Sequence, residues 1–178
     1  MTPQETRQQL YDTMVINKPV EVAAITDKIL LHKARYISCA HLFSNPGLLW
    51  WFIAVIFQME CELDFNRYLG NGQLLDRKTT IVPIGRGPFD TWEDGVKDAL
   101  NIQAANRITD WSMGNVLYWI EGYNGYGYEQ YHNMNSPYLW AGSDKYLKGK
   151  YTSDGKFNPN AISNQTGVAL LLKTLLNN

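Results

Sequence analysis

The sequence predicts a mainly α-helical fold of the α+β class, with a buried central helix and a small β-hairpin lobe. Apolar residues recur at helical spacing along most of the chain. The segment 48–57, LLWWFIAVIF, is apolar nearly all round, which is typical of a helix at the centre of a core. The stretch 78–83 instead has the β-branched residues and the proline and glycine boundaries of a short strand. Because 178 residues fit one ordinary domain, we expect a single domain over residues 1–178.

The N-terminal part is expected to form three helices. The first covers about 3–16 and the second about 20–39, both with apolar residues at helical spacing. The third covers about 47–60 and contains the long apolar run, so it should be the central helix. Ser44 or Asn45 can cap its start, because short polar side chains accept hydrogen bonds from the first backbone amides of a helix.

Turn and capping signals divide the rest of the chain. The glycines at 70–72 are a strong turn signal, and the strand at 78–83 is expected to belong to a small hairpin that follows this turn. The later elements are expected to be a helix from Thr91 to about Arg107, a helix over 114–121, a mostly irregular stretch over 122–157, and a last helix opened by Asn158-Pro159.

The charge balance and the apolar runs exclude several classes of partner. The 16 Lys and Arg residues nearly balance the 17 Asp and Glu residues, which gives a net charge of −1. This balance argues against a nucleic-acid partner and against binding to anionic lipid by bulk charge. The longest apolar run, 48–57, is well short of the ~20 residues of a membrane span, so we expect no stable membrane insertion. The first residues are polar, so we also expect no signal peptide.

The two cysteines are interpreted as buried apolar side chains. Cys39 and Cys61 have neither the spacing of a zinc site nor a cluster of histidines beside them. We therefore expect no metal and no cofactor. Free cysteines are often interior, although the separation of these two also permits one disulfide.

Glu60 is the candidate catalytic residue that the pattern indicates. A carboxylate that emerges from an apolar helix is poorly solvated, which favours its protonated form and raises its pKa. Glycosidic cleavage needs such a carboxylic acid, because the leaving oxygen must be protonated as the bond breaks. The alternative is that Glu60 only marks the end of the helix and points into water.

A second carboxylate would complete a glycosidase pair. Asp64 lies four residues after Glu60, on the same helix face if the helix continues, so the two would be neighbours rather than groups on opposite sides of a sugar. An inverting mechanism needs roughly 6.5–9.5 Å between the carboxyl groups, and Asp76 from the hairpin fits that separation better. Either aspartate could instead be an ordinary solvated acid.

Aromatic residues make up 13 % of the chain, and two segments of the C-terminal half are rich in them. The segment 123–128, YNGYGY, combines glycines that permit close approach of a ligand with tyrosines whose faces and hydroxyls can bind sugars. The segment 136–140, SPYLW, adds more aromatic surface. The candidates for glycan contact in these segments are Tyr123, Tyr126, Tyr138 and Trp140. The alternative is a glycine-rich loop packed by aromatic side chains.

A series of motifs follows in one order along the chain. They are WWFIAVI at 50–56, Met59-Glu60, Asn71-Gly72, Val82-Pro83, Gly85-Arg86, Thr91-Trp92-Glu93, YNGYGY at 123–128, SPYLW at 136–140 and KGKY at 148–151. In this order and spacing they resemble the small lysozyme-like peptidoglycan hydrolases of bacteriophages and bacteria. The resemblance covers about Arg35 to the C-terminus.

The resemblance implies a lysozyme-like fold in which the glutamate that ends the central helix faces a cleft between a helical and a β-containing lobe. Glu60 matches that catalytic acid. Tyr123 and Asn124 look like the Tyr-Asn pair that lines the sugar cleft. Thr79 lies where the hairpin would approach the cleft and could hold a water or a sugar.

The expected function is that of a monomeric lysozyme or endolysin, which cleaves the β-1,4 bond between N-acetylmuramic acid and N-acetylglucosamine in peptidoglycan. Two alternatives stay open: a lytic transglycosylase acting on the same bond, and a non-catalytic glycan-binding virion module. The chain departs from the family at Glu62, where a small hydroxyl residue is common, and at Gln73, where an aspartate is usual. If phage-encoded, it would stay in the host cytoplasm until a holin releases it to the cell wall.

Overall fold

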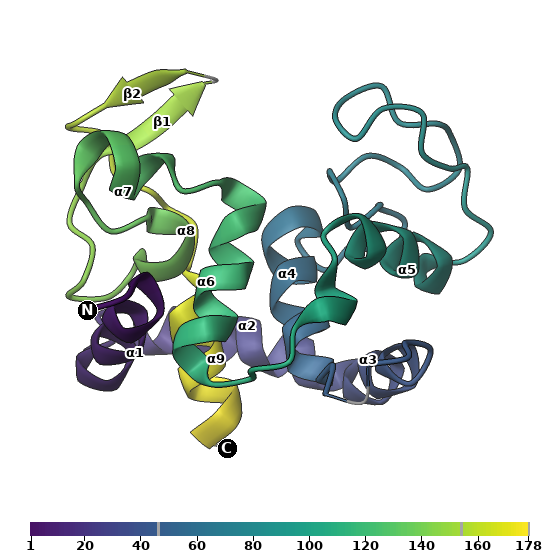
Figure 1. Ribbon diagram of the computed structural model, residues 1–178, viewed down its shortest axis with the longest axis horizontal. Coiled ribbons are helices and arrows are strands. Elements are labelled where there is room, and N and C mark those ends of the chain that lie inside the picture. The colour runs from purple at the N-terminus through teal and green to yellow at the C-terminus, as the bar shows by residue number, and fades with distance from the viewer. Residues whose placement is uncertain (46, 154, 178) are drawn as a thin grey trace. The chain divides into compact units, whose positions relative to one another are not determined.

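The computed structural model describes residues 1–45, 47–153 and 155–177. The chain is mainly helical, with 51 % of its residues in helices, and it forms two compact units (Figure 1). Unit 1 comprises Met1–Asp27 and Asp110–Asn178, and unit 2 comprises Lys28–Thr109. The predicted mainly helical α+β class is confirmed, whereas the single catalytic domain over 1–178 stays a prediction.

Unit 1 is built from helices of both chain ends. They are α1 (Pro3–Thr13), most of α2 (Pro19–Leu31), α6 (Met113–Asn124), α7 (Gly127–His132), α8 (Pro137–Trp140) and α9 (Val168–Asn177). Six of the 10 residues of helix α9 are buried, and all six are apolar. The N-terminal and C-terminal helices therefore share one core.

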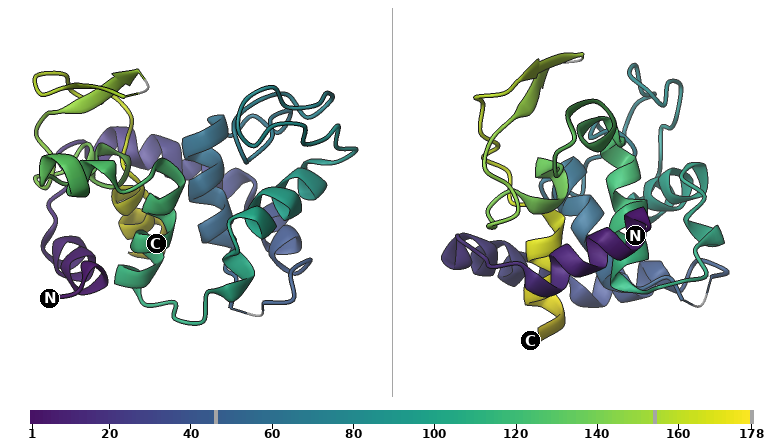
Figure 2. Two further views of the ribbon diagram at one scale, coloured as in Figure 1. Left: turned by 45° about the horizontal axis from the view of Figure 1, so that its top comes forward. Right: turned by 60° about the vertical axis from the view of Figure 1, so that its left-hand side comes forward.

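Helix α1 packs against α6, as two views show (Figure 2). A capping box closes the first turn of α1, because Thr2 and Glu5 each bond the other's backbone amide. On the facing helix, Gly114 permits a close approach, since a Cβ atom there would collide with the carbonyl oxygen of Gln4. The Gly114 amide donates a hydrogen bond of 2.8 Å to the side-chain oxygen of Gln8. Gly114 thus sets the spacing of this helix pair.

The β-hairpin lies in unit 1, not at the position expected from the sequence. Strands β1 (Lys150–Ser153) and β2 (Lys156–Asn158) pair antiparallel, with Tyr151 opposite Phe157 and an irregularity in register between Tyr151 and Ser153. Residues 78–83 form no strand, so the strand predicted there is wrong.

Side-chain hydrogen bonds explain why 78–83 is not a strand. The side-chain oxygen of Gln73 accepts hydrogen bonds from the amides of Thr80 (2.7 Å) and Ile81 (3.2 Å). The side-chain amide of Asn71 donates to the carbonyls of Ile81 (3.1 Å) and Val82 (3.4 Å). These four backbone groups therefore bond side chains instead of the backbone of a partner strand.

Unit 2 is formed around a buried apolar helix. Its helices are α3 (Lys33–Ala40), α4 (Trp50–Cys61), α5 (Trp92–Ile102) and the 3₁₀-helix η1 (Ala105–Arg107). Nine of the 12 residues of α4 are buried, so the prediction of a buried helix is confirmed. The rings of Phe57, Phe65 and Trp92 form a cluster in which each pair of centroids is 4.9 Å apart.

The start of α4 differs from the expected one. The helix begins after Leu49, and neither Ser44 nor Asn45 caps it. The Asn45 side-chain oxygen instead accepts a 2.9 Å hydrogen bond from the Gly47 amide. Its side-chain nitrogen donates to the carbonyl of Ile108 at 3.0 Å, which ties Asn45 to the chain after η1.

Three other helix boundaries also differ. The helix expected over 20–39 is interrupted at His32 and forms α2 and α3. The helix expected to reach Arg107 ends at Ile102, because Ala104 takes a left-handed conformation with φ 55°. The last helix begins at Val168, not at Asn158, whose side chain accepts the Asn160 amide in a turn (2.9 Å).

The stretch 122–157, expected to be irregular, contains regular structure. It holds the end of α6, all of α7 and α8, and most of the hairpin. Tyr128 fixes the hairpin, because its hydroxyl oxygen accepts a hydrogen bond from the Tyr151 amide at 3.1 Å. The ring of His132 stacks on Phe157 with centroids 3.6 Å apart. Aromatic packing between distant segments thus produces the strands that local composition did not predict.

Both cysteines are free and buried. Burial raises the pKa of the Cys39 thiol to about 12 and raises the pKa of Cys61 as well, so neither is a reactive thiolate near neutral pH. In the part of the chain that the structure describes, no helix has the length and apolar character needed to cross a bilayer.

Candidate functional site

Glu60 lies in the last turn of α4 and is half-buried, between the buried residues Met59 and Cys61. The helix ends directly after it, because Glu62 and Leu63 both have positive φ angles, 52° and 62°. The Glu62 amide closes the helix by donating to the carbonyl of Gln58 at 3.1 Å. The expected position of Glu60, at the end of a buried helix, is confirmed.

A glycine turn packs against the backbone of Glu60. Gly72 has φ 72°, and a Cβ atom on it would lie 2.7 Å from the carbonyl oxygen of Glu60. The Gly72 carbonyl accepts a hydrogen bond of 2.8 Å from the guanidinium of Arg67. The Asn71-Gly72 turn therefore sits directly on the C-terminal end of α4, at the residue expected to carry the chemistry.

The loop that follows this turn is held by the side chains of Asn71 and Gln73, described above. Neither was identified from the sequence as a residue that positions a loop. The one sign in the sequence that Gln73 could hold the loop is that it stands where an aspartate is usual. A side-chain amide can both donate and accept hydrogen bonds, whereas an aspartate carboxylate only accepts them. The side-chain nitrogen of Gln73 does donate to the Thr80 hydroxyl, at 2.9 Å.

Asp64 is fully engaged in a turn after α4. Its carboxylate accepts hydrogen bonds from the amide and the side chain of Asn66, both at 3.0 Å, and from Arg67 at 3.0 Å. The backbone bond from Asn66 is the main cause that lowers the pKa of Asp64, with further lowering by Arg67. Since α4 ends at Cys61, the helix does not continue to Asp64, so the condition for a helix face shared with Glu60 is not met.

Asp76 and Thr79 are placed differently within the loop. Asp76 has 69 % of its side chain exposed and pairs with Arg77 at 2.7 Å, which lowers the pKa of Asp76. Thr79 is buried, and its hydroxyl donates to the carbonyl of Pro83 at 2.5 Å and accepts the Arg86 amide at 2.9 Å. The Thr79 hydroxyl thus closes its own loop. Roles for these two residues toward a substrate stay predictions.

Asp98 on α5 anchors the other side of the loop. Its carboxylate accepts a hydrogen bond of 2.7 Å from the hydroxyl of the buried Tyr68, and it forms an ion pair with Arg86. Burial opposes ionisation of Asp98, but the bonds from Arg86 and Tyr68 outweigh it and lower its pKa. The interactions of Asp98 with Tyr68 and Arg86 therefore depend on the negative charge of its carboxylate.

Acid is expected to weaken the contribution of Asp98 to stability. The pKa of Asp98 is lower in the folded than in the unfolded chain, so this contribution is full above the unfolded value of about 4 and is lost as pH falls through the folded value. We expect the difference in unfolding free energy between wild type and Asp98→Asn to be largest above about pH 5 and to shrink toward pH 3. Urea titrations across this range measure it. A difference that grew on acidification would contradict the assignment.

In unit 1, Asn124 borders two adjacent hollows at the end of α6. The larger, of about 440 Å³, is also lined by Gly127, Tyr128 and Tyr151. The smaller, of about 170 Å³, shares Asn124, Tyr128 and Tyr151 and is also lined by Tyr138. Two residues of the predicted glycan contacts, Asn124 and Tyr138, thus meet at one place, while Tyr123 lies next to Asn124 in the last turn of α6.

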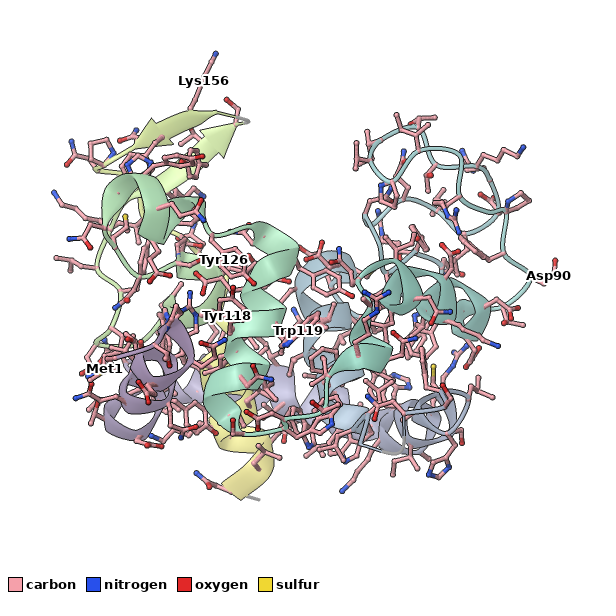
Figure 3. The ribbon with its side chains drawn as sticks, viewed as in Figure 1. Met1, Asp90, Tyr118, Trp119, Tyr126 and Lys156 are labelled. Carbon is pink, nitrogen blue, oxygen red and sulfur yellow. The ribbon has the colours of Figure 1, made fainter. Side chains whose placement is uncertain are left out.

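Tyr126 and Trp140 are used in packing. The ring of Tyr126 stacks on Tyr118 with centroids 4.8 Å apart, and its hydroxyl donates to the Tyr118 carbonyl at 3.0 Å (Figure 3). Trp140 has 1 % of its surface exposed, so its ring belongs to the core of unit 1 and offers no open face for stacking on a sugar. A large aromatic residue has the same sequence signature in a core and in a sugar site, which is why burial was needed to separate them.

A buried charge network in unit 1 was missed by sequence reasoning. The guanidinium of Arg7 donates to Glu121 at 2.7 Å, to Glu129 at 2.9 Å and to the Pro3 carbonyl at 2.9 Å. The side chains of Arg7 and Glu121 are only 5 % and 3 % exposed, whereas Glu129 is 49 % exposed. The one available signal was Glu121 itself, a charge inside the apolar run of α6.

The network shifts the titration of its members. Burial raises the pKa of Glu121, and the neighbouring Arg7 opposes this rise. Burial alone would lower the pKa of Arg7. The carboxylates of Glu121 and Glu129 have the larger combined effect, so the pKa of Arg7 is raised. A cavity of about 250 Å³ adjoins the three side chains. The pair is therefore a buried ion pair whose partners depend on each other for solvation.

No family model, no curated protein and no solved structure matches this chain. Among the residues that the structure describes, no group of three or more His, Cys, Asp or Glu side chains could hold a metal ion. Any functional conclusion therefore depends on the residues of the two units themselves.

Proposed function

We propose that this protein is a lysozyme-like peptidoglycan hydrolase that cleaves the β-1,4 bond between N-acetylmuramic acid and N-acetylglucosamine. The observation that carries the proposal is the position of Glu60, half-buried in the last turn of a helix that is otherwise almost entirely buried. The motifs around Glu60 and Asn124, which resemble those of lysozyme-like enzymes, support it.

In this proposal Glu60 is the general acid. Its carboxylic acid donates a proton to the glycosidic oxygen as the bond to the anomeric carbon breaks, so that the leaving sugar departs as a neutral alcohol. A water molecule adds to the anomeric carbon and gives up one proton, which balances the proton that Glu60 donated. Glu60 follows the buried apolar residues of α4, and this position supports the acid role. The Gly72 turn on the Glu60 carbonyl oxygen keeps this end of the helix in place.

The tyrosine-rich hollows of unit 1 support binding of a glycan. Asn124, Tyr128 and Tyr151 combine an amide, hydroxyl groups and ring faces, which are the groups that bind sugars through hydrogen bonds and stacking. Tyr128 is 6 % exposed and its hydroxyl is held by the hairpin, so Asn124 and Tyr151 are the side chains expected to contact the glycan.

One observation favours the lytic transglycosylase as second candidate. Asp64 and Asp76, the two candidates for a second carboxylate, are both ion-paired with arginines. A transglycosylase needs no second carboxylate to activate water, because the 6-hydroxyl of the muramic acid attacks its own anomeric carbon. The product then has a 1,6-anhydro ring in place of a reducing end.

Digestion of purified sacculi tests both candidates. The protein is incubated with peptidoglycan, and the released fragments are analysed by mass spectrometry. Muropeptides with reducing ends are expected for hydrolysis. Fragments 18 mass units lighter, with an anhydro ring, would replace the hydrolase by the transglycosylase. Binding to sacculi without any release would reject both and identify a glycan-binding module.

A further inference from the structure

The smaller hollow of unit 1 has a cation in its lining. Lys150, the first residue of β1, is half-buried and borders the hollow of about 170 Å³ together with Asn124, Tyr138 and Ser163. The other side chains of the lining are neutral, and none of those in the described residues is acidic. The hollow therefore combines hydrogen-bonding groups with one positive charge.

Lys150 differs from the lysines near it in the sequence. Lys145 pairs with Asp144 at 2.9 Å, and Lys148 donates to the side chain of Asn160 at 2.9 Å. For Lys150, no ion pair joins its ammonium group to a carboxylate within the ranges 1–45, 47–153 and 155–177. A half-buried lysine that has no carboxylate partner among the described residues is suited to an anionic ligand.

The backbone around Lys150 is held firmly in place. Lys150 lies opposite Asn158 in the hairpin, and the next amide, that of Tyr151, donates to the Tyr128 hydroxyl at 3.1 Å. The Tyr151 hydroxyl forms a 2.9 Å hydrogen bond with the ring of His132. A site held in this way needs little ordering when a ligand binds, which favours affinity.

We propose that Lys150 and the smaller hollow bind a carboxylate of the stem peptide that is attached to muramic acid. This inference rests on the proposed function, because it concerns the substrate which that function assigns to the protein. The lysine ammonium supplies the charge, while Asn124 and Ser163 provide neutral groups for the amide and hydroxyl groups around the carboxylate. The protein then prefers peptide-bearing peptidoglycan to peptide-free glycan and to chitin.

Binding to two fragments of the wall tests the proposal. One is the disaccharide GlcNAc-MurNAc with its stem peptide, and the other is the same disaccharide with a neutral carboxamide on the lactyl group in place of the peptide. Neither contains the bond to be cleaved, so calorimetry measures binding alone. A charge-assisted hydrogen bond contributes about 1.5–3 kcal/mol, so we expect Lys150→Gln to weaken binding of the peptide-bearing fragment by about 10–100-fold. Binding of the peptide-free fragment stays unchanged.

Two variants of the hairpin serve as controls. Lys156→Gln removes the same charge from β2, where the side chain is exposed and points outward (Figure 3), and it should leave both affinities unchanged. Lys150→Arg keeps the positive charge and should retain most of the preference for the peptide-bearing fragment. If Lys150→Arg bound as weakly as Lys150→Gln while its unfolding curve matched the wild type, the charge would not be the cause and the proposal would be overturned.

The outcomes separate this proposal from the proposed function. If the wild-type protein cleaves sacculi but Lys150→Gln binds both fragments as the wild type does, the inference about Lys150 is wrong and the enzyme assignment stands. If sacculi are not cleaved, yet the peptide-bearing fragment is bound in a Lys150-dependent way, the enzyme assignment fails and the carboxylate site stands. Equal binding of both fragments by the wild type would overturn the inference.

Discussion

Replacing Glu60 by glutamine is expected to lower the rate of peptidoglycan cleavage by about 10²–10⁴-fold, the range that general acid catalysis contributes. Glutamine has nearly the same size and shape as glutamate but cannot donate a carboxylic proton. Glu60 is half-buried at the end of α4, so the exchange creates no cavity, and we expect the unfolding free energy to change by about 0.5 kcal/mol or less. The rate of muropeptide release from purified sacculi measures the effect.

Asp90→Asn is the matched control for this experiment. Asp90 is an exposed carboxylate of unit 2 that points outward from the loop before α5 (Figure 3), so the same chemical change there should leave the rate unaltered. Urea unfolding of each variant shows whether the fold is retained. Cleavage by Glu60→Gln at the parental rate would reject Glu60 as the general acid.

Replacing Arg7 by methionine is expected to lower the free energy of unfolding by about 3–5 kcal/mol. The change removes the cation that solvates Glu121, whose side chain is 3 % exposed, and leaves a carboxylate in the core of unit 1 without its partner. It also removes the hydrogen bonds of Arg7 to Glu129 and to the Pro3 carbonyl. Urea denaturation followed by far-UV circular dichroism measures the loss.

Two further variants identify the cause of this loss. Arg77→Met makes the same exchange in an exposed ion pair, where both side chains are more than 60 % exposed, and should cost about 1 kcal/mol or less. In the double variant Arg7→Met with Glu121→Leu, no buried charge is left unpaired, so much of the stability should return. If Arg7→Met cost no more than Arg77→Met, the buried pair would not be a major support of unit 1.

The sequence predicted best where the signal is local. Residues 51–57 of the apolar run are buried as expected, because a helix that is apolar all round has no face to turn toward water. The interruption at His32 and the end of α5 at Ile102 were missed. In both segments, apolar residues keep helical spacing beyond the residue at which the helix ends. The end depends on a local backbone conformation, which the spacing of apolar residues does not reveal.

The candidate site was predicted in part for a similar reason. Glu60 follows from its position at the end of an apolar helix, whereas the state of Asp64 depends on Asn66 and Arg67, which meet it in a turn. Trp140 was expected at a sugar and is in the core, because a buried and an exposed tryptophan look alike in a sequence. Lys150 is part of the KGKY motif at 148–151, but its place beside the smaller hollow depends on the tertiary structure.

By itself, the sequence determined the mainly helical class, the buried helix over 51–61 and the candidate acid near its end. These features depend on which residues of a helix are buried, and the spacing of apolar residues in the sequence indicates this. Only the tertiary structure decided that Gln73 and Asn71 bond the backbone of 80–82, that the hairpin forms at 150–158, and that Arg7 meets Glu121, 114 residues away in the chain. Such contacts join distant residues through single hydrogen bonds, and a single bond leaves no periodic trace in the sequence.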